Sequence, residues 1–339
     1  IKNRPDMTNT IKSLKRFRWL FFLVLISTIQ AKTPNIVVIL TDDQGWGDLS
    51  LNGNKDLSTP NIDSLAHDGA RFDRFFVCPV CSPTRAEFLT GRYHVRGGVY
   101  STSTGGERLN LDELTIADTF KSAGYATGAF GKWHNGTLDR RYEPNARGFE
   151  EFVGFCGGWS DYYQWHLRFN DSLSKGNGDY LTEVLTKSAC KYIKRHQKDP
   201  FFLMLTYTAP HSPFQAPQNL VDYYLNKGFE RITAITYAMI EAMDSGIGQV
   251  LDQLKIEGLD ENTIVMFTSD NGPAFFNPPF MLEPGENPFN ERFNVGLRGS
   301  KGWVYDGGIR IPMVIRWTAG LSAWRLGKYN KAAEFFSNF

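Results

Sequence analysis

Short runs of consecutive apolar residues alternate along the chain with stretches in which apolar residues recur at helical spacing. Continuous apolar runs of this length are typical of strands buried on both faces, and a spacing of three to four residues predicts helices. The pattern therefore predicts an α/β fold, a large mostly parallel sheet sandwiched by helices. Strands are expected at Asn35–Leu40, Tyr125–Phe130, Phe201–Tyr207, Thr263–Ser269 and Met313–Arg316, and helices at Leu114–Ala123, Leu181–Gln197 and Ile232–Leu254.

Polar residues directly follow four of these predicted strands. In an open α/β sheet, the carboxyl ends of parallel strands meet at one edge, and ligands bind there. We therefore expect one shared site at this edge. In the order of the strands, its candidate residues are Asp42 and Asp43, Lys132 and His134, His211, and Asp270 and Asn271.

Four of these residues, Asp42, Asp43, Asp270 and Asn271, offer only oxygen ligands. Such a set favours a hard cation, Ca²⁺ or Mg²⁺, over zinc. The neighbouring carboxylates of Asp42 and Asp43 would also repel each other if they were buried without a cation. Either short motif alone is more often a turn or a helix cap, so the predicted metal site depends on the two motifs meeting at one edge.

A helix is expected to begin just after Cys81. Ser82 is a favoured N-cap and Pro83 a favoured first helical residue, while Gly91 favours the end of the helix. Cys81 would then lie at the positive end of the helix, where backbone N–H groups attract an anion. Arg85, one turn further on, would reach the same place.

The stretch Cys81–Arg92, CSPTRAEFLTGR, resembles the signature of the formylglycine-dependent type I sulfatases, which are arylsulfatase-like members of the alkaline phosphatase superfamily. The resemblance covers roughly residues 33–318 and implies an alkaline-phosphatase-like fold. Further matching segments follow in the family's order at Thr33–Asp43, Thr59–Asp63, Gly131–His134, Pro210–His211, Ser269–Gly272 and Arg298–Lys301.

In sulfatases, the signature cysteine is oxidised to formylglycine by a formylglycine-generating enzyme, and the hydrate of this aldehyde attacks the sulfur of a sulfate ester. The resemblance thus implies a sulfuric ester hydrolase that acts on a sulfated carbohydrate or an aryl sulfate. It also implies a bound Ca²⁺, with Mg²⁺ as the alternative. The implied metal ligands are Asp42, Asp43, Cys81 as formylglycine, Asp270 and Asn271.

The resemblance also implies roles for the remaining site residues. Arg85, Lys132 and Lys301 would neutralise the charge of the sulfate together with the metal. His211, assisted by Lys301, would protonate the leaving alcohol, and His134 would take the proton whose removal expels sulfate and restores the aldehyde. Viewed singly, lysines are usually plain surface residues.

Three segments are predicted along the chain. Residues 1–31 are typical of a signal peptide, because basic residues precede the apolar run Trp19–Ile26 and a cleavage point follows Ala31. That run is short for a membrane span of ~20 residues, although an uncleaved anchor is the alternative. Residues 32–318 would form the sulfatase catalytic domain. Residues 319–339 are unassigned, since they do not resemble the small C-terminal domain with which the family continues.

Charge and cysteine content narrow the function further. The 37 Lys and Arg balance 36 Asp and Glu, so no nucleic-acid partner is expected. The four cysteines do not suggest a disulfide scaffold.

Export is expected, to the periplasm, the cell exterior or a lysosome. Two alternatives stay open: a phosphonate or phosphodiester hydrolase of the same superfamily, and a truncated, non-catalytic binder of sulfated glycans. The sugar and the oligomeric state are not predicted.

Overall fold

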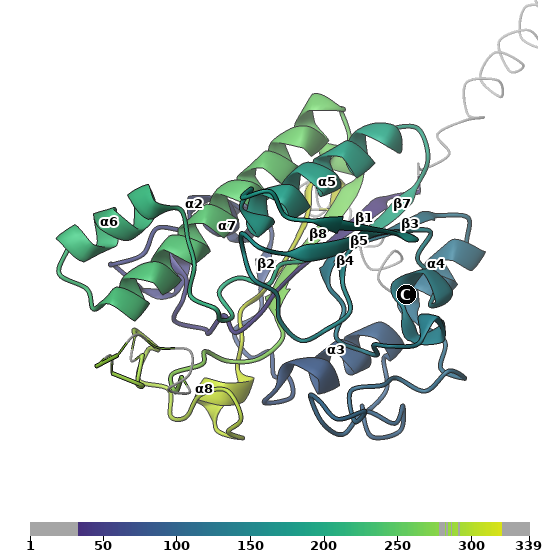
Figure 1. Cartoon of the computed structure of the whole chain (residues 1–339). Coiled ribbons are helices and arrows are strands. Elements are labelled where there is room, and N and C mark those ends of the chain that lie inside the picture. The colour runs from purple at the N-terminus through teal and green to yellow at the C-terminus, as the bar shows by residue number, and fades with distance from the viewer. Residues whose placement is uncertain (1–32, 278–281, 283, 286, 291, 321–339) are drawn as a thin grey trace, which may run out of the picture. The chain divides into compact units, whose positions relative to one another are not determined.

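A nine-stranded sheet lies between two layers of helices in the computed structural model, which describes residues 33–277, 282, 284–285, 287–290 and 292–320 (Figure 1). The order of the strands is β2-β9-β8-β1-β7-β3-β4-β5-β6. Their bounds are β1 Asn35–Thr41, β2 Ala70–Arg71, β3 Ala126–Lys132, β4 Glu151–Phe155, β5 His166–Phe169, β6 Ser172–Lys175, β7 Phe201–Thr206, β8 Thr263–Ser269 and β9 Met313–Trp317.

The five central strands, β8, β1, β7, β3 and β4, run parallel, and the pairs at both edges are antiparallel. Strand β1 is the middle of this parallel region, and all seven of its residues are buried. Its register on β8 pairs Thr41 with Ser269, so both strands end at the same level. The predicted mostly parallel sheet is confirmed.

Successive residues of the central strands pack into two hydrophobic cores, one on each face of the sheet. Val37 and Ile39 belong to the core under α5 (Leu181–Arg195) and α7 (Arg231–Ile256), whereas Val38 and Leu40 belong to the core under α3 (Cys81–Thr90) and α4 (Ile116–Ser122). A strand buried on both faces needs apolar side chains at successive positions, which explains the continuous run.

The helices are α2 Pro60–His67, α3 Cys81–Thr90, α4 Ile116–Ser122, α5 Leu181–Arg195, α6 Gln218–Asn226, α7 Arg231–Ile256 and α8 Asp306–Ile309, with short 3₁₀ turns at Ser50–Asn52, Arg140–Tyr142, Pro144–Ala146 and Asp260–Asn262.

All five predicted strands and all three predicted helices are present, with shifts of one or two residues at most of their ends. The largest relevant shift is at β3, which continues to Lys132 instead of ending at Phe130. No helix among the described residues is long and apolar enough to cross a membrane. The predicted signal peptide and nearly all of the predicted tail lie outside the described residues, so both stay predictions.

Candidate active site

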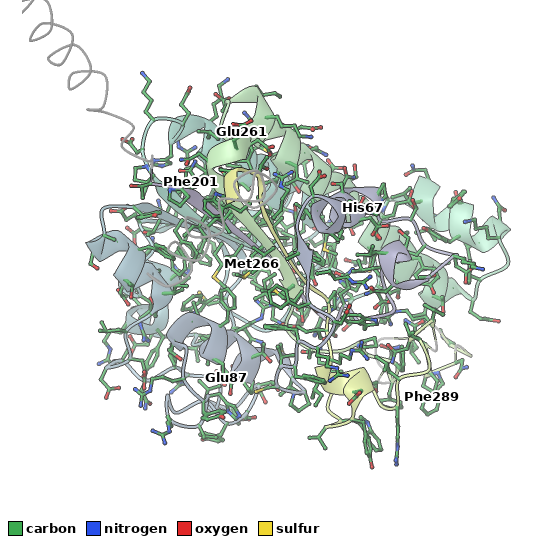
Figure 2. All side chains as sticks on the ribbon, turned by 180° about the vertical axis from the view of Figure 1, so that it is seen from behind. His67, Glu87, Phe201, Glu261, Met266 and Phe289 are labelled. Atoms are coloured by element: carbon green, nitrogen blue, oxygen red, sulfur yellow. The ribbon has the colours of Figure 1, made fainter. Side chains whose placement is uncertain are left out.

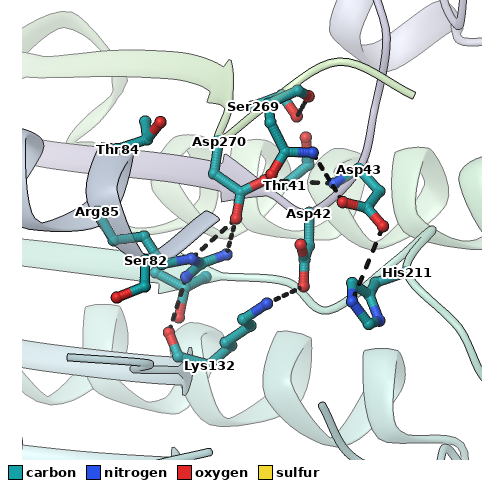
Figure 3. A network of polar contacts seen from close by, with 12 residues as sticks. Thr41, Asp42, Asp43, Ser82, Thr84, Arg85, Lys132, His211, Ser269 and Asp270 are labelled. Atoms are coloured by element: carbon teal, nitrogen blue, oxygen red, sulfur yellow. Dashed lines mark hydrogen bonds and ion pairs between the residues drawn. The ribbon is translucent and has the colours of Figure 1, made fainter. Parts of the chain in front are cut away.

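The carboxyl ends of β1 and β8 place three carboxylates and one amide side by side (Figure 3). The backbone N–H of Asp43 donates to Asp270 Oδ1 over 3.3 Å, and Asn271 Nδ2 donates to Asp43 Oδ1 over 2.7 Å. Asp42 lies directly after β1, and all four side chains are buried. The two motifs of the predicted metal site therefore meet at one edge of the sheet.

Two lysines pair with the adjacent carboxylates. Lys132 Nζ lies 2.6 Å from Asp42 Oδ2, and both side chains are fully buried. Lys301 Nζ lies 2.6 Å from Asp43 Oδ1. Burial opposes the charge of Lys301, but the carboxylate of Asp43 outweighs it and raises the lysine pKa. Neither residue is a plain surface lysine.

Arg85, on α3, ties this helix to the end of β8. Its Nε donates to Asp270 Oδ2 over 2.9 Å, and its Nη1 donates to the carbonyl of Lys132, also over 2.9 Å. Burial and the nearby charge of Asp42 nevertheless raise the pKa of Asp270 to about 6. The guanidinium is buried in the site (Figure 3), so it contributes positive charge from a fixed position.

Helix α3 begins at Cys81 itself, which corrects the expected capping by Ser82. The N-cap is Val80, in an extended conformation without a side-chain cap. The hydroxyl of the buried Ser82 instead lies 3.5 Å from the carbonyl of Glu107. The predicted end is confirmed, because Gly91 takes the left-handed conformation with φ 65°.

The side chain of Cys81 points into the same cluster as the carboxylates. Its Sγ, an oxygen of Asp42 and an oxygen of Asp270 all lie within 4.8 Å of one another. Burial raises the pKa of the thiol, against the charges of Lys132 and Lys301. The side chain is only 2% exposed. An unmodified Cys81 would therefore be a neutral thiol and a poor nucleophile.

His211 faces Asp43 across the cluster (Figure 3). Its Nε2 lies 3.8 Å from Asp43 Oδ2, and its Nδ1 lies 2.6 Å from the carbonyl of Ser212. Since a carbonyl can only accept, Nδ1 carries the proton and the lone pair of Nε2 points toward the site. Burial and the charge of Lys301 lower the pKa of His211 to about 3, so the ring is neutral near pH 7.

His134 has the opposite arrangement of its ring nitrogens. Its Nε2 lies 2.8 Å from the carbonyl of Thr102 and so donates to it. Its Nδ1 is buried and has no hydrogen-bond partner in the described part of the chain. Burial and the charge of Lys132 lower the pKa of His134 to about 2. This histidine therefore offers an open acceptor nitrogen.

Two further oxygens of the cluster, Asp42 Oδ1 and Asn271 Oδ1, are buried without a hydrogen-bond partner among the described residues. Buried polar atoms normally have such a partner, and a bound ion is one explanation for an orphan. Asp42 also belongs to two groups of side chains spaced for a cation, one with Cys81 and Asp270 and one with Asp43 and His211. The oxygen-rich set fits a hard cation.

Two buried residues near the site were not predicted. Arg292 contacts both oxygens of Asp48 at 2.7 and 2.8 Å and donates to the carbonyl of Asp43 over 3.2 Å. Asn135 Nδ2 donates to the carbonyl of Ser82 over 3.1 Å. Asn135 directly follows the matched segment Gly131–His134, which was an available signal, whereas no local pattern marks Arg292.

A pocket of about 890 Å³ adjoins the cluster through Lys301. Its lining combines aromatic rings with positive charge. The Trp303 and Tyr305 rings stack at 6.2 Å, and the guanidinium of Arg298 lies 3.9 Å from the centre of the Tyr305 ring. Rings and arginines of this kind provide flat and positively charged contacts for a ligand.

Comparisons with known proteins agree on one family. The sequence model of the family described as Sulfatase matches residues 34–339. Arylsulfatase J of Mus musculus is 33% identical over 301 residues, which cover 84% of this chain and 48% of that protein. The N-acetylgalactosamine-6-sulfatase of Homo sapiens is 32% identical over 328 residues, which cover 87% and 59% of the two chains.

A solved structure, that of Ps i-CgsB in complex with k-i-k-neocarrahexaose, gives the same result. It is 33% identical, has a TM-score of 0.74, and aligns with 84% of this chain and 66% of its own. The chain thus spans 48% of the length of arylsulfatase J and 59% of the length of the human N-acetylgalactosamine-6-sulfatase.

Proposed function

The chain belongs to the sulfatase family, and on this premise we propose that it hydrolyses a sulfate ester with a formylglycine formed from Cys81 and a bound Ca²⁺. One observation carries the proposal: the Cys81 side chain lies within 4.8 Å of carboxylate oxygens of Asp42 and Asp270, at the first residue of α3. A thiol of raised pKa has little nucleophilic power there, which favours a modified residue. The aldehyde hydrate would supply the nucleophile.

The cation would be held by the oxygen ligands of the cluster, with Mg²⁺ as the alternative to Ca²⁺. The orphaned Oδ1 atoms of Asp42 and Asn271 support this assignment. When bound, the ion would act as a Lewis acid on a sulfate oxygen. The proposed ligands are Asp42, Asp43, Asp270, Asn271 and the modified side chain at Cys81.

The charges of the site suit an anionic substrate. The carboxylates of Asp42, Asp43 and Asp270 are each paired with one cation, Lys132, Lys301 and Arg85 respectively. These charges cancel, so a divalent ion would leave a net positive site that attracts a sulfate ester. Fixed positive groups of this kind also stabilise charge that grows on the sulfate oxygens during transfer.

The two histidines suit opposite proton transfers. The proposed role of His134 is to accept a proton, and its open Nδ1 is already an acceptor. The proposed role of His211 is to donate a proton from Nε2 to the leaving alcohol. Because its pKa is about 3, His211 is neutral near pH 7, and it would carry that proton only while negative charge grows on the leaving oxygen beside Nε2.

A sulfated carbohydrate is the proposed substrate class, with an aryl sulfate as the alternative. The pocket beside Lys301 supports it, since Trp303 and Tyr305 offer flat rings for a sugar and Arg298 offers a charge for a further acidic group. The relatives carry names that fit both alternatives, arylsulfatase and N-acetylgalactosamine-6-sulfatase.

The test is expression with a formylglycine-generating enzyme, the proposed maturation partner, followed by mass spectrometry of the peptide around residue 81. We expect an aldehyde at position 81 and release of inorganic sulfate from an aryl sulfate or a sulfated oligosaccharide. Cys81→Ala is the control and should release none. An aldehyde-bearing protein that releases no sulfate, or that strongly prefers an aryl phosphonate, would contradict the proposal.

A further inference from the structure

A second cluster of metal-binding side chains lies around α3, and it shares no residue with the proposed catalytic site. It consists of Cys78 before the helix, Glu87 on the helix (Figure 2) and His94 after it. The Sγ of Cys78, a carboxylate oxygen of Glu87 and a ring nitrogen of His94 all lie within 4.8 Å of one another. Residues from both sides of one helix thus converge on one point.

The donor atoms of this cluster differ from those at the strand ends. Cys78, Glu87 and His94 offer one sulfur, one oxygen and one nitrogen, whereas the residues after β1 and β8 offer oxygens. Thiolate, imidazole and carboxylate are all zinc ligands, and the three residues leave one of the four positions of a tetrahedral zinc ion for water. Hard cations such as Ca²⁺ prefer oxygen ligands to sulfur and nitrogen ligands.

Hydrogen bonds hold the three residues in place. His94 Nδ1 lies 2.6 Å from the carbonyl of Val99 and donates to it, so Nε2 keeps a free lone pair. A carbonyl that orients the other ring nitrogen is the usual support of a metal-binding histidine. The backbone N–H of His94 donates to Glu87 Oε1 over 3.2 Å, and the hydroxyl of Thr84 donates to the carbonyl of Cys78 over 3.2 Å.

All three side chains are half-buried, which leaves a path from solvent. Burial and the charge of Glu87 raise the pKa of Cys78 to about 12. A thiol next to a carboxylate stays protonated by itself, but a coordinated cation reverses this preference and deprotonates the thiol. Cys78 and Glu87 can therefore both be ionised at the same time only if a cation lies between them.

We propose that Cys78, Glu87 and His94 bind a zinc-class divalent cation that ties the segment before α3 to the segment after it. The ion would clamp both ends of the helix whose first residue is Cys81. Its role is structural, and it is independent of whether the protein hydrolyses sulfate esters.

The test uses Co²⁺ as a spectroscopic probe on the full chain with Cys81→Ser as the parent, so that the thiol at position 81 contributes no signal. Excess Ca²⁺ fills the oxygen-rich site. We expect a thiolate-to-cobalt charge-transfer band that saturates at one ion per chain and is displaced by Zn²⁺. A folded parent that gives no such band would overturn the proposal.

Variants then locate the signal. Adding Cys78→Ser should abolish the band, and Glu87→Gln or His94→Gln should weaken Co²⁺ binding by more than about tenfold. Cys190→Ser is the matched control, because Cys190 is also half-buried but lies on α5, outside the cluster. Loss of the band in that control, or its persistence without Cys78, would place the ion elsewhere.

A thermal measurement keeps the proposal testable if the Cys78 variant does not fold. Zn²⁺ should raise the Tm of the parent, since a ligand that binds only the folded chain stabilises it. The same addition should raise the Tm less in Glu87→Gln and His94→Gln. Equal Zn²⁺ stabilisation in the parent and in both variants would contradict the site.

Discussion

The polar site at the strand ends and the aromatic pocket beside it are built in contrasting ways. In the site, each carboxylate is paired with a cation and nearly every side chain is buried. In the pocket, Phe276 and Trp303 are 56% and 58% exposed and come from segments outside the sheet. The contrast teaches that the sheet positions the chemistry rigidly, whereas loops present the surface that would distinguish one substrate from another.

The largest expected effect comes from removing one partner of a buried ion pair in the polar site. Arg85→Ala leaves Asp270 buried without its partner, and removing one member of a buried pair costs about 3–5 kcal/mol. We expect this loss in the free energy of unfolding, measured with urea in the absence of Ca²⁺. Arg140→Ala is the control, because the Arg140–Asp171 pair is exposed and worth about 0–1 kcal/mol. Similar losses in both variants would show that burial does not set the strength of the pair.

A pH series probes the same region through His134. Its pKa is lowered from 6.5 to about 2, so below pH 6.5 the unfolded chain binds a proton that the folded chain does not. Stability is therefore lost as the pH falls through this window, by about 1.4 kcal/mol per pH unit. Between pH 7.5 and pH 5, His134→Gln should lose about 2 kcal/mol less than the parent in urea unfolding. Equal slopes would mean that His134 is not buried as a neutral ring.

A substitution in the aromatic pocket is expected to change substrate binding and not stability. Trp303→Ala removes an exposed ring, so stability should change by less than about 0.5 kcal/mol. If the pocket holds the sugar, KM for a sulfated oligosaccharide should rise about tenfold, or about 1.4 kcal/mol. Hydrolysis of a small aryl sulfate should stay unchanged, because such a substrate does not extend over Trp303. Equal losses on both substrates would place the ring in the reaction itself.

The smallest expected effect comes from a helix cap that belongs to neither the polar site nor the pocket. Thr115 and Asp118 form a capping box at the start of α4, and Thr115→Ala should cost about 1 kcal/mol. Activity should not change beyond that loss of stability. Ser122→Ala, at the exposed end of the same helix, should be close to neutral. A change in kcat for Thr115→Ala would show that the site is less rigid than its ion pairs suggest.

Central strands such as β1 and β7 could be predicted because burial on both faces requires a continuous apolar run. The short strand β4 and the outer strands β2, β5 and β6 were not predicted. His166–Phe169 and Ser172–Lys175 are largely polar and exposed, and they become strands only because a neighbouring strand offers hydrogen bonds. Their signal lies in the tertiary structure and not in the local sequence.

The same division holds for the candidate site. Residues that directly follow strands, such as Asp42 and Asp270, could be placed together from the topology of a parallel sheet alone. Arg292 and the cluster around Cys78 could not, since the paths of loops bring them into contact. The proton positions on His134 and His211 depend on single carbonyl groups, which no residue pattern encodes.

The burial of Cys81 bears on whether the cysteine would be modified before or after the chain folds. At 2% exposure, the sulfur of Cys81 is out of reach of a modifying enzyme in the folded chain, so the proposed oxidation to formylglycine would have to precede folding. The cluster around Cys81 includes Asp43 and Asp270, which are 227 residues apart in the sequence and meet where β1 pairs with β8. Contacts between such distant parts of a chain form slowly. Long-range pairing of this kind would leave the cysteine accessible until β1 and β8 have paired, which is the period in which the proposed modification would have to occur.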